Sequence, residues 1–285
     1  MTDVVYVAGP WDRNEELRYS LRSLAAHLPH GRVWVAGHRP PWLAGTVGHI
    51  QVPPAQSRFE SSTANLRAAC EHPEVSEEFV YFNDDFFVME PVEGVPVMHR
   101  GPLADVIEGT RSSLYRRGAQ ATGLLMERLG LADDGPLLSY ELHVPLPVTK
   151  AGMLAAMKAG RGLPVLHKRT LYGNLHRLGG EQLLDVKVTG PDDPGPGGPW
   201  LSTSDASFEQ GAVGERIRAA FPEPCRYEDG YEQPPPAQGA GPAREGPEPP
   251  SQRASKAEWA AFADSQDPGD HSGMTKAQLI EQYGR

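Results

Sequence analysis

The segment that most constrains the fold of this chain is an apolar run interrupted by one amide and two adjacent carboxylates. It reads Phe79-Val80-Tyr81-Phe82-Asn83-Asp84-Asp85-Phe86-Phe87-Val88. Aromatic and β-branched residues dominate the run, which predicts a buried strand. A carboxylate beside such a strand costs on the order of several kcal/mol unless a cation or hydrogen bonds compensate its charge. We therefore predict a buried strand that ends in a charged site at Asp84 and Asp85.

Two interpretations of Asn83-Asp84-Asp85 stay open at this point. In the first, Asp84 and Asp85 hold Mg²⁺ or Mn²⁺, because these cations prefer oxygen ligands and Mg²⁺ is commonly bound by one or two carboxylates together with substrate phosphates. In the second, the triplet is a turn in which Asn83 and Asp84 bond locally to the backbone. The flanking aromatic residues favour the metal site.

Composition restricts the class of protein. The chain has 285 residues, of which 39% are hydrophobic and 22% charged, enough for one sizeable core and an appendage. The formal net charge of −10 argues against extended nucleic-acid binding, which needs a basic surface. Cys70 and Cys225 are the only cysteines, a usage typical of a reducing compartment. Without an apolar run of membrane-spanning length or a leader pattern, we expect a cytoplasmic protein with no membrane span.

The first third of the chain predicts a parallel sheet. A strand over residues 3–9, a helix and a strand over residues 32–37 form a βαβ unit. The helix carries a core stripe of leucines, and Asp12 with Glu15 predicts a capping box at its start. A short strand over 50–52 and a helix over 63–71 follow. Ligands of such sheets bind at the carboxyl ends of the strands, where Asp84 and Asp85 fall.

Further elements are expected after the acidic strand. A strand over 95–98 continues the sheet, and a helical insertion over about 103–130 suits an acceptor-binding lobe. Its arginines are typical of a solvated helix face. His143 precedes Pro145 by two residues, which predicts an ordered, non-helical segment around it. A helix over 151–158, a Pro- and Gly-rich loop over 191–199, a strand over 200–203 and a helix over 211–221 complete the unit.

The C-terminal part differs in composition. Residues 229–254 are rich in Pro and Gly and predict an extended linker. Residues 255–285 contain two short helical patterns, and the second, from Thr275 to Ile280, weakly resembles helix-loop-helix modules of the LEM and SAP type. We therefore predict three parts: an α/β domain over 1–228, the linker, and a small helical hairpin that binds a partner.

Four blocks, in order, resemble the Stealth family of sugar-phosphate transferases, which includes bacterial capsule enzymes and N-acetylglucosamine-1-phosphotransferases. The blocks are residues 16–23 with 33–36 and 41–43, residues 79–87, residues 143–147, and Ser204-Asp205 with residues 221–228. The resemblance implies an α/β fold of the nucleotide-sugar-transferase (GT-A) type with flanking helices, here with the helical appendage. It also implies a nucleotide-diphosphate sugar donor, UDP-sugar favoured, and a hydroxyl-bearing acceptor such as a glycan.

The resemblance assigns roles to individual residues. The metal ligands are Asp84 and Asp85, for Mg²⁺ or Mn²⁺. The catalytic candidates are His143, as base or electrostatic donor, Arg169, as the cation on the leaving phosphate, and Asp205, as a further ligand or only a cap of the turn before its helix. The nucleotide-sugar-binding candidates are Asp3, Asn14, Arg18, Arg22 and Asn83. Arg18 and Arg22 lie one helical turn apart and can reach one phosphate, although most helical arginines are merely solvated.

The expected reaction moves a sugar-1-phosphate from the donor to an acceptor hydroxyl, with release of a nucleoside monophosphate. Two alternatives remain: direct glycosyl transfer with release of the nucleoside diphosphate, and a module that binds a sugar nucleotide or glycan without turnover. The chain departs from the family in one respect that bears on this choice. Where the family carries a glutamate on the helix before the acidic strand, this chain has Asn65 and Leu66.

Overall fold

The structure, a computed structural model, describes residues 1–55, 57–111, 113–163, 165–232, 250–251, 254–266 and 274–283. The chain divides into two compact units, Met1–Glu232 and Gln233–Arg285, which are described separately. Most of the predicted linker lies outside the described residues. The predicted boundaries at 228 and 254 therefore remain predictions.

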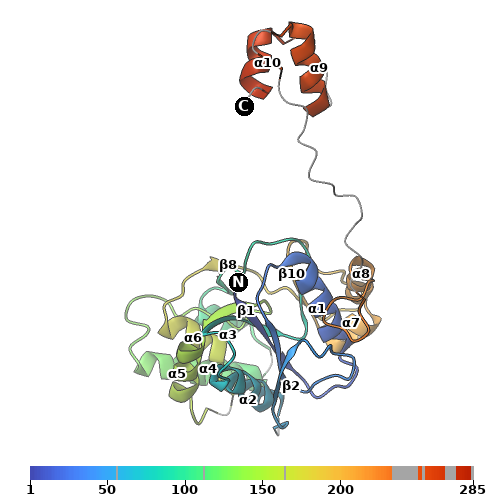
Figure 1. Cartoon of the computed structure of the whole chain (residues 1–285). Helices are drawn as coiled ribbons and strands as arrows, with labels where there is room; N and C mark the ends of the chain where they lie inside the picture. The colour runs from blue at the N-terminus through green and yellow to red at the C-terminus, as the bar shows by residue number, and fades with distance from the viewer. Residues whose placement is uncertain are drawn as a thin grey trace. The chain divides into compact units, whose positions relative to one another are not determined.

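A five-stranded sheet forms the centre of the first unit, with strand order β3-β2-β1-β4-β7 (Figure 1). Four of its strands are parallel: β1 (Asp3–Ala8), β2 (Val33–Gly37), β3 (Gly48–Gln51) and β4 (Glu78–Asn83). The fifth, β7 (Leu146–Thr149), pairs antiparallel with β4. Pro147 is tolerated in β7 because this strand lies at the edge of the sheet, where a missing N–H leaves no ladder bond unmade. The predicted α/β class is confirmed.

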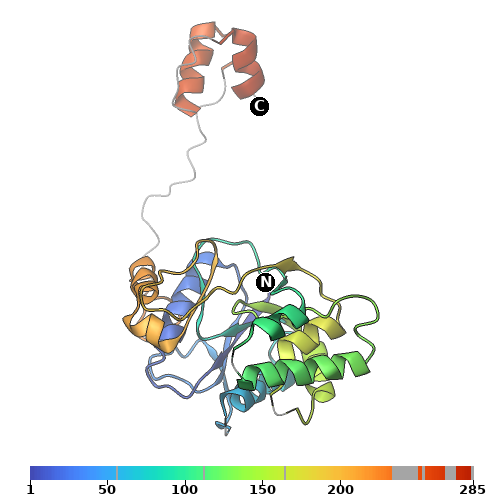
Figure 2. The ribbon, with the colours of Figure 1, turned by 180° about the vertical axis from the view of Figure 1, so that it is seen from behind.

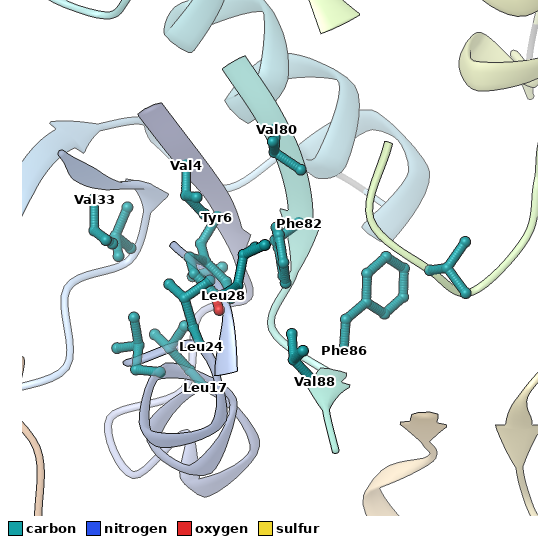
Figure 3. Packing of buried hydrophobic residues seen from close by; sticks show 14 of the residues in the cluster. Val4, Tyr6, Leu17, Leu24, Leu28, Val33, Val80, Phe82, Phe86 and Val88 are labelled. Atoms are coloured by element: carbon teal, nitrogen blue, oxygen red, sulfur yellow. The ribbon is translucent and has the colours of Figure 1, made fainter. Parts of the chain in front are cut away.

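Helices cover both faces of this sheet (Figures 1 and 2). Helix α1 (Glu15–His27) packs on one face, where its leucines meet Val4 and Tyr6 of β1 and Phe82 of β4, as Figure 3 shows. The opposite face, which includes Val5 and Tyr81, is covered by five helices. These are α2 (Arg58–Glu71), α3 (Leu103–Gly109), α4 (Ser113–Arg128), α5 (Lys150–Ala159) and α6 (Lys168–Leu175).

The order of the strands creates a switch point between β1 and β4. From β1 the chain crosses through α1 to β2 on one side, and from β3 it returns through α2 to β4 on the other side of β1. Right-handed crossovers in opposite directions place α1 and α2 on opposite faces of the sheet. In open α/β sheets such a switch point, here at the carboxyl ends of β1 and β4, is the crevice in which ligands bind.

The apolar run from Phe79 to Val88 forms two strands rather than one, because the chain turns at Asp84-Asp85. The second strand, β5 (Phe86–Val88), belongs to a separate sheet, β5-β10-β9, with β10 (Trp200–Thr203) and β9 (Lys187–Val188). Side chains of α1 bond to the other edge of β5. Ser20 donates to the carbonyl of Phe86, and the N–H of Val88 donates to Ser23 Oγ over 3.0 Å. These bonds to β5 explain why α1 has the buried hydroxyl groups of Ser20 and Ser23 on its packed face.

Several predicted elements differ from the structure. The strand predicted at 95–98 was expected to extend the main sheet, but β6 (Met98–His99) pairs with β8 (Glu181–Gln182) in a separate two-stranded sheet. The helical insertion consists of two helices, α3 and α4. An additional helix, α7 (Asp205–Gln210), precedes α8 (Ala212–Ala220).

The predicted helix cap at Asp12 is also wrong. Asn14 is the N-cap of α1: it adopts a left-handed conformation with φ 30°, and its side chain accepts from the N–H of Leu17. Asp12 instead accepts a bond of 2.8 Å from His38.

The described part of the second unit contains two helices, α9 (Lys256–Gln266) and α10 (Lys276–Tyr283), with Trp259, Ala263 and Leu279 buried between them. Both begin with a reciprocal capping pair, Ser255 with Glu258 and Thr275 with Gln278. Within the ranges that the structure describes, none of the helices combines the length and apolar character that crossing a bilayer requires.

A buried ion pair joins the two ends of the first unit. Arg22 of α1 donates from Nε and Nη2 to both oxygens of Glu228, over 2.7 and 2.8 Å, and from Nη1 to the carbonyls of Phe221 and Pro222. Only 9% of each of the two charged side chains is exposed. The prediction that Arg22 binds the nucleotide sugar is therefore wrong: its donors stabilise the fold.

This pair yields a stability prediction. Glu228→Gln leaves the Arg22 charge buried without a carboxylate, so the free energy of unfolding in urea is expected to fall by about 3 kcal/mol. Glu74→Gln is the matched control, because Glu74 meets Arg32 in a pair with half or more of both side chains exposed, and its cost is expected to stay below about 1 kcal/mol. Equal losses in the two variants would contradict the structural role of Arg22.

Candidate functional site at the carboxyl ends of β1 and β4

Asp84 lies at the switch point and ties three elements together. Its Oδ2 accepts hydrogen bonds from the N–H of Gly9, just beyond β1, over 3.2 Å, and from Asn14 Nδ2 over 2.9 Å. Asn14 at the same time caps α1. Burial, and after it the charge of Asp85, raise the pKa of Asp84 against the lowering effect of the bonds from Asn14 and Gly9, to a final value of about 6. Asp84 therefore sits where a cation would lower the free energy of its charged form.

Asp85 turns toward the smaller sheet. Its Oδ2 lies 2.6 Å from Lys187 Nζ on β9 and accepts a bond from Ser202 Oγ on β10 over 3.2 Å. Its carbonyl accepts from the N–H of Thr203 over 3.3 Å. A lysine thus already neutralises one of the two carboxylates that were predicted to hold a metal.

A third carboxyl group, that of Glu16, faces the same crevice and was not among the predicted site residues. Glu16 stands in the first turn of α1 and accepts a hydrogen bond from Thr203 Oγ1. Burial, together with the charges of Asp85, Asp84 and Asp205, raises the pKa of Glu16 against the lowering effect of the bond from Thr203, to a final value of about 9. We therefore expect Glu16 to be protonated at neutral pH. One feature of the sequence could have indicated Glu16 as a site residue. It lies two residues after Asn14, at the start of the helix that follows the carboxyl end of β1.

The donor set fits a hard divalent cation only in part. Oxygen ligands from mutually repelling carboxylates suit Mg²⁺ or Mn²⁺, and the Oδ1 atom of Asn83, in the residue before Asp84, is buried without a hydrogen-bond partner in the described part of the chain. However, the described residues contain no group of three His, Cys, Asp or Glu side chains arranged to hold a metal ion. A cation at this turn would be held by Asp84 and Asp85 and would need further ligands from a substrate.

His143 lies in a second polar cluster. Its Nδ1 is 2.9 Å from both carboxylate oxygens of Asp185, and its backbone N–H donates to Asp185 Oδ1 over 3.3 Å. Arg100 Nη1 approaches Asp185 Oδ2 to 3.5 Å. The His143 ring meets the ring of Phe86 edge-on, with centroids 6.4 Å apart. Because Phe86 directly follows Asp85, this contact brings His143 next to the acidic turn.

The segment that leads into β9 connects the two clusters. Asp185 and Lys187 are half-buried and alternate with Val186 and Val188, which are buried. Extended chain places alternate residues on the same side, with Cα atoms about 7 Å apart. Asp185 therefore contacts His143 while Lys187, on the same side, contacts Asp85.

The structure does not place Arg169 on a leaving phosphate. Its side chain is 4% exposed, its Nη1 donates to the carbonyl of Leu142 over 2.7 Å, and its Nη2 donates to the carbonyl of Val144. The guanidinium also lies over the rings of Tyr81 and Phe86. Arg169 therefore holds the backbone on both sides of His143, and the predicted direct role on phosphate is corrected to a supporting one.

Other predicted binding residues lie away from the crevice. Asp3 is at the amino end of β1, where it accepts from Trp34 Nε1 and from the N–H groups of Arg32 and Ser76, so its predicted role at the site is wrong. Arg18 pairs with Glu15 and Glu228 and stacks over Trp42. Its charge is thus used within the fold rather than at the carboxylates.

Asp205 is exposed in the first turn of α7 and is not its cap, because Ser204 fills that position. Its charge nevertheless acts on Glu16, so it borders the crevice. Asn65, at the position of the family glutamate, is 5% exposed and donates to the carbonyl of Ala8 over 3.1 Å. The amide therefore supports the end of β1.

Comparisons with known proteins show distant similarities. No family model matches the chain. A stretch of 165 residues is 25% identical to the capsular polysaccharide phosphotransferase LcbA of Neisseria meningitidis, covering 50% of this chain and 44% of that protein. The chain is similar to a capsular polysaccharide phosphotransferase. The resemblance to the Stealth family is confirmed as a distant one.

The chain spans less than half the length of the matched phosphotransferase. Among solved structures, the WbbM bifunctional glycosyltransferase in its apo form matches with a TM-score of 0.37 and 12% identity, over 78% of this chain and 45% of that one. A likeness at that level carries no argument about this chain.

The carboxyl cluster predicts a particular pH dependence of stability. Glu16 ordinarily has a pKa of 4.5 and has one of about 9 when folded, so between these values the folded state binds a proton that the unfolded state releases. The free energy of unfolding should then fall as pH rises, by up to about 1.4 kcal/mol per pH unit. In EDTA, Glu16→Gln should lack this loss, whereas Glu15→Gln, at the neighbouring helix position, should keep it. Parallel pH curves for wild type and Glu16→Gln would show that Glu16 is not held protonated.

Proposed function

We propose that the first unit is a metal-dependent transferase that moves a sugar-1-phosphate from a nucleotide-diphosphate sugar to an acceptor hydroxyl in polysaccharide synthesis. The observation that carries this proposal is the placement of Asp84 and Asp85 at the switch point, in a chain similar to a capsular polysaccharide phosphotransferase. UDP-sugar is the favoured donor and a glycan hydroxyl the favoured acceptor, both by resemblance to the Stealth family.

The cluster around Asp84 and Asp85 and the cluster around His143 would have different roles in the reaction. Asp84 and Asp85 would hold Mg²⁺ or Mn²⁺, which supplies charge neutralisation for the diphosphate of the donor. His143 receives the proton of the acceptor hydroxyl at Nε2. The hydroxyl oxygen forms a bond to the phosphorus that carries the sugar, and the bond from this phosphorus to the nucleoside phosphate breaks. Lys187, beside Asp85 and partly exposed, is the cation of the site nearest to the departing phosphate in this scheme.

A second candidate function is sugar-nucleotide or glycan binding without turnover. Asn65 supports this alternative, because an amide bonded to the Ala8 carbonyl replaces the acid that the family carries there. Metal-dependent hydrolysis of the donor distinguishes the two functions, since a binding module consumes no donor.

The metal proposal is tested by binding and turnover together. Asp84→Asn and Asp85→Asn each remove a charge but little volume, so calorimetric affinity for Mn²⁺ should fall at least about tenfold and turnover of a sugar-nucleotide panel should be abolished. Asp12→Asn, an exposed aspartate after β1, is the control and should retain both. Unchanged Mn²⁺ affinity and full activity in Asp85→Asn would refute the assignment.

Product analysis tests the type of transfer. Attack at phosphorus releases a nucleoside monophosphate, whereas attack at the anomeric carbon releases the nucleoside diphosphate. Mass spectrometry of the products is expected to show the monophosphate. Release of the diphosphate would replace the proposal by direct glycosyl transfer.

A further inference from the structure

His143 and Asp185 are joined by both side-chain and backbone contacts, although the pair lies near the surface. Both carboxylate oxygens lie 2.9 Å from Nδ1, and one of them also accepts the backbone N–H of the same histidine. About a third of the His143 side chain is exposed, compared with 21% of Asp185. One residue therefore fixes both the ring and the backbone of His143 while the ring stays accessible.

The chemistry of the pair determines which ring nitrogen carries the proton. Burial would raise the pKa of Asp185, but the hydrogen bonds from His143 and the charge of Arg100 act against it, and the pKa lies below its ordinary value. An ionised carboxylate only accepts hydrogen bonds, so Nδ1 must be the donor. In the neutral imidazole the lone pair is then on Nε2, for which the described residues offer no hydrogen-bond partner.

The backbone around His143 is held from the other side as well. Arg169 donates to the carbonyls of Leu142 and Val144, the residues on either side of His143. Arg169 is itself fixed in the first turn of α6, where Glu141 accepts the N–H groups of Arg169 and Thr170. The segment around His143 and helix α6 therefore hold each other in place, and several contacts fix the position of the His143 ring.

We propose that Asp185 is a positioning residue for His143, which it holds with the proton on Nδ1 and with Nε2 free to accept the proton of the acceptor hydroxyl. This inference rests on the proposed function. As the hydroxyl oxygen bonds to phosphorus and the leaving phosphate departs with its bonding electrons, Nε2 gains the hydroxyl proton, and the ionised Asp185 stabilises the resulting imidazolium. Asp185 itself gains no proton. Lys187, two residues after Asp185, contacts Asp85. The same segment therefore fixes the distance between His143 and the acidic turn.

The first test compares two aspartates that are both bound by several donors. Asp185→Asn presents an amide to Nδ1 and favours the tautomer with the proton on Nε2, so kcat should fall roughly a hundredfold or more with KM for the donor changed only a few-fold. Asp3→Asn is the matched control. Asp3 is 8% exposed and accepts three hydrogen bonds at the amino end of β1, so this variant should lose melting temperature but keep its turnover per folded molecule.

A double-mutant cycle tests whether Asp185 acts through His143. His143→Ala alone should lower kcat at least as much as Asp185→Asn, and adding Asp185→Asn to His143→Ala should have almost no further effect. If the two losses multiply instead, Asp185 acts elsewhere and the proposal is overturned. The same conclusion follows if Asp185→Asn keeps near-normal kcat while His143→Ala loses it.

A spectroscopic measurement separates this inference from the proposed function. Nitrogen-15 chemical shifts of the His143 ring in the full chain should report the Nδ1-protonated tautomer in wild type and a loss of that preference in Asp185→Asn. An unchanged tautomer in Asp185→Asn overturns the inference even if the enzyme is active. Absence of donor turnover in wild type, with the tautomer result as expected, overturns the proposed function and leaves the positioning of His143 by Asp185 established.

Discussion

The structure depends on how two adjacent carboxylates are accommodated at the end of a buried parallel strand. Asp84 and Asp85 follow β4 at a position enclosed by β1, α1 and the smaller sheet. An unpaired carboxylate at such a position is strongly disfavoured, so each is given its own partners. Asp84 is bound by the backbone of Gly9 and the amide of Asn14, and Asp85 by Lys187 and Ser202.

These partners also explain the path of the chain around the site. Asn14 can bind Asp84 only because it adopts the left-handed conformation that starts α1 directly after β1. Lys187 and Ser202 come from β9 and β10, which pair with each other and with β5, the strand that leaves the acidic turn. Residues more than a hundred positions apart therefore meet at Asp85. Burial, with the charges of Asp85, Asp84 and Asp205 added to it, also raises the pKa of Glu16 beside this turn.

Arginines in this protein are used mainly to fix segments. Arg22 joins α1 to Glu228 near the end of the first unit, and Arg169 joins α6 to the backbone around His143. A guanidinium suits this role because its planar set of donors satisfies several acceptors at once and stays charged when buried. Lys187 and Arg100, by contrast, stay partly exposed; Lys187 contacts Asp85 and Arg100 contacts Asp185.

Local patterns of apolar and charged residues were enough to predict the α/β class, the strands and the helix of the first βαβ unit, and the position of the acidic turn. The sequence also indicated His143, through its extended segment and the family resemblance. The sequence did not determine which distant side chains complete the site, since the hydrogen bonds of Glu16, Asp185 and Lys187 depend on how separate sheets and helices pack. For the same reason Arg22 and Arg169 were predicted to bind substrate. A buried arginine has the same sequence signal as a phosphate-binding one. The contacts show that the three donor nitrogens of Arg22 and both Nη atoms of Arg169 are already bonded within the fold.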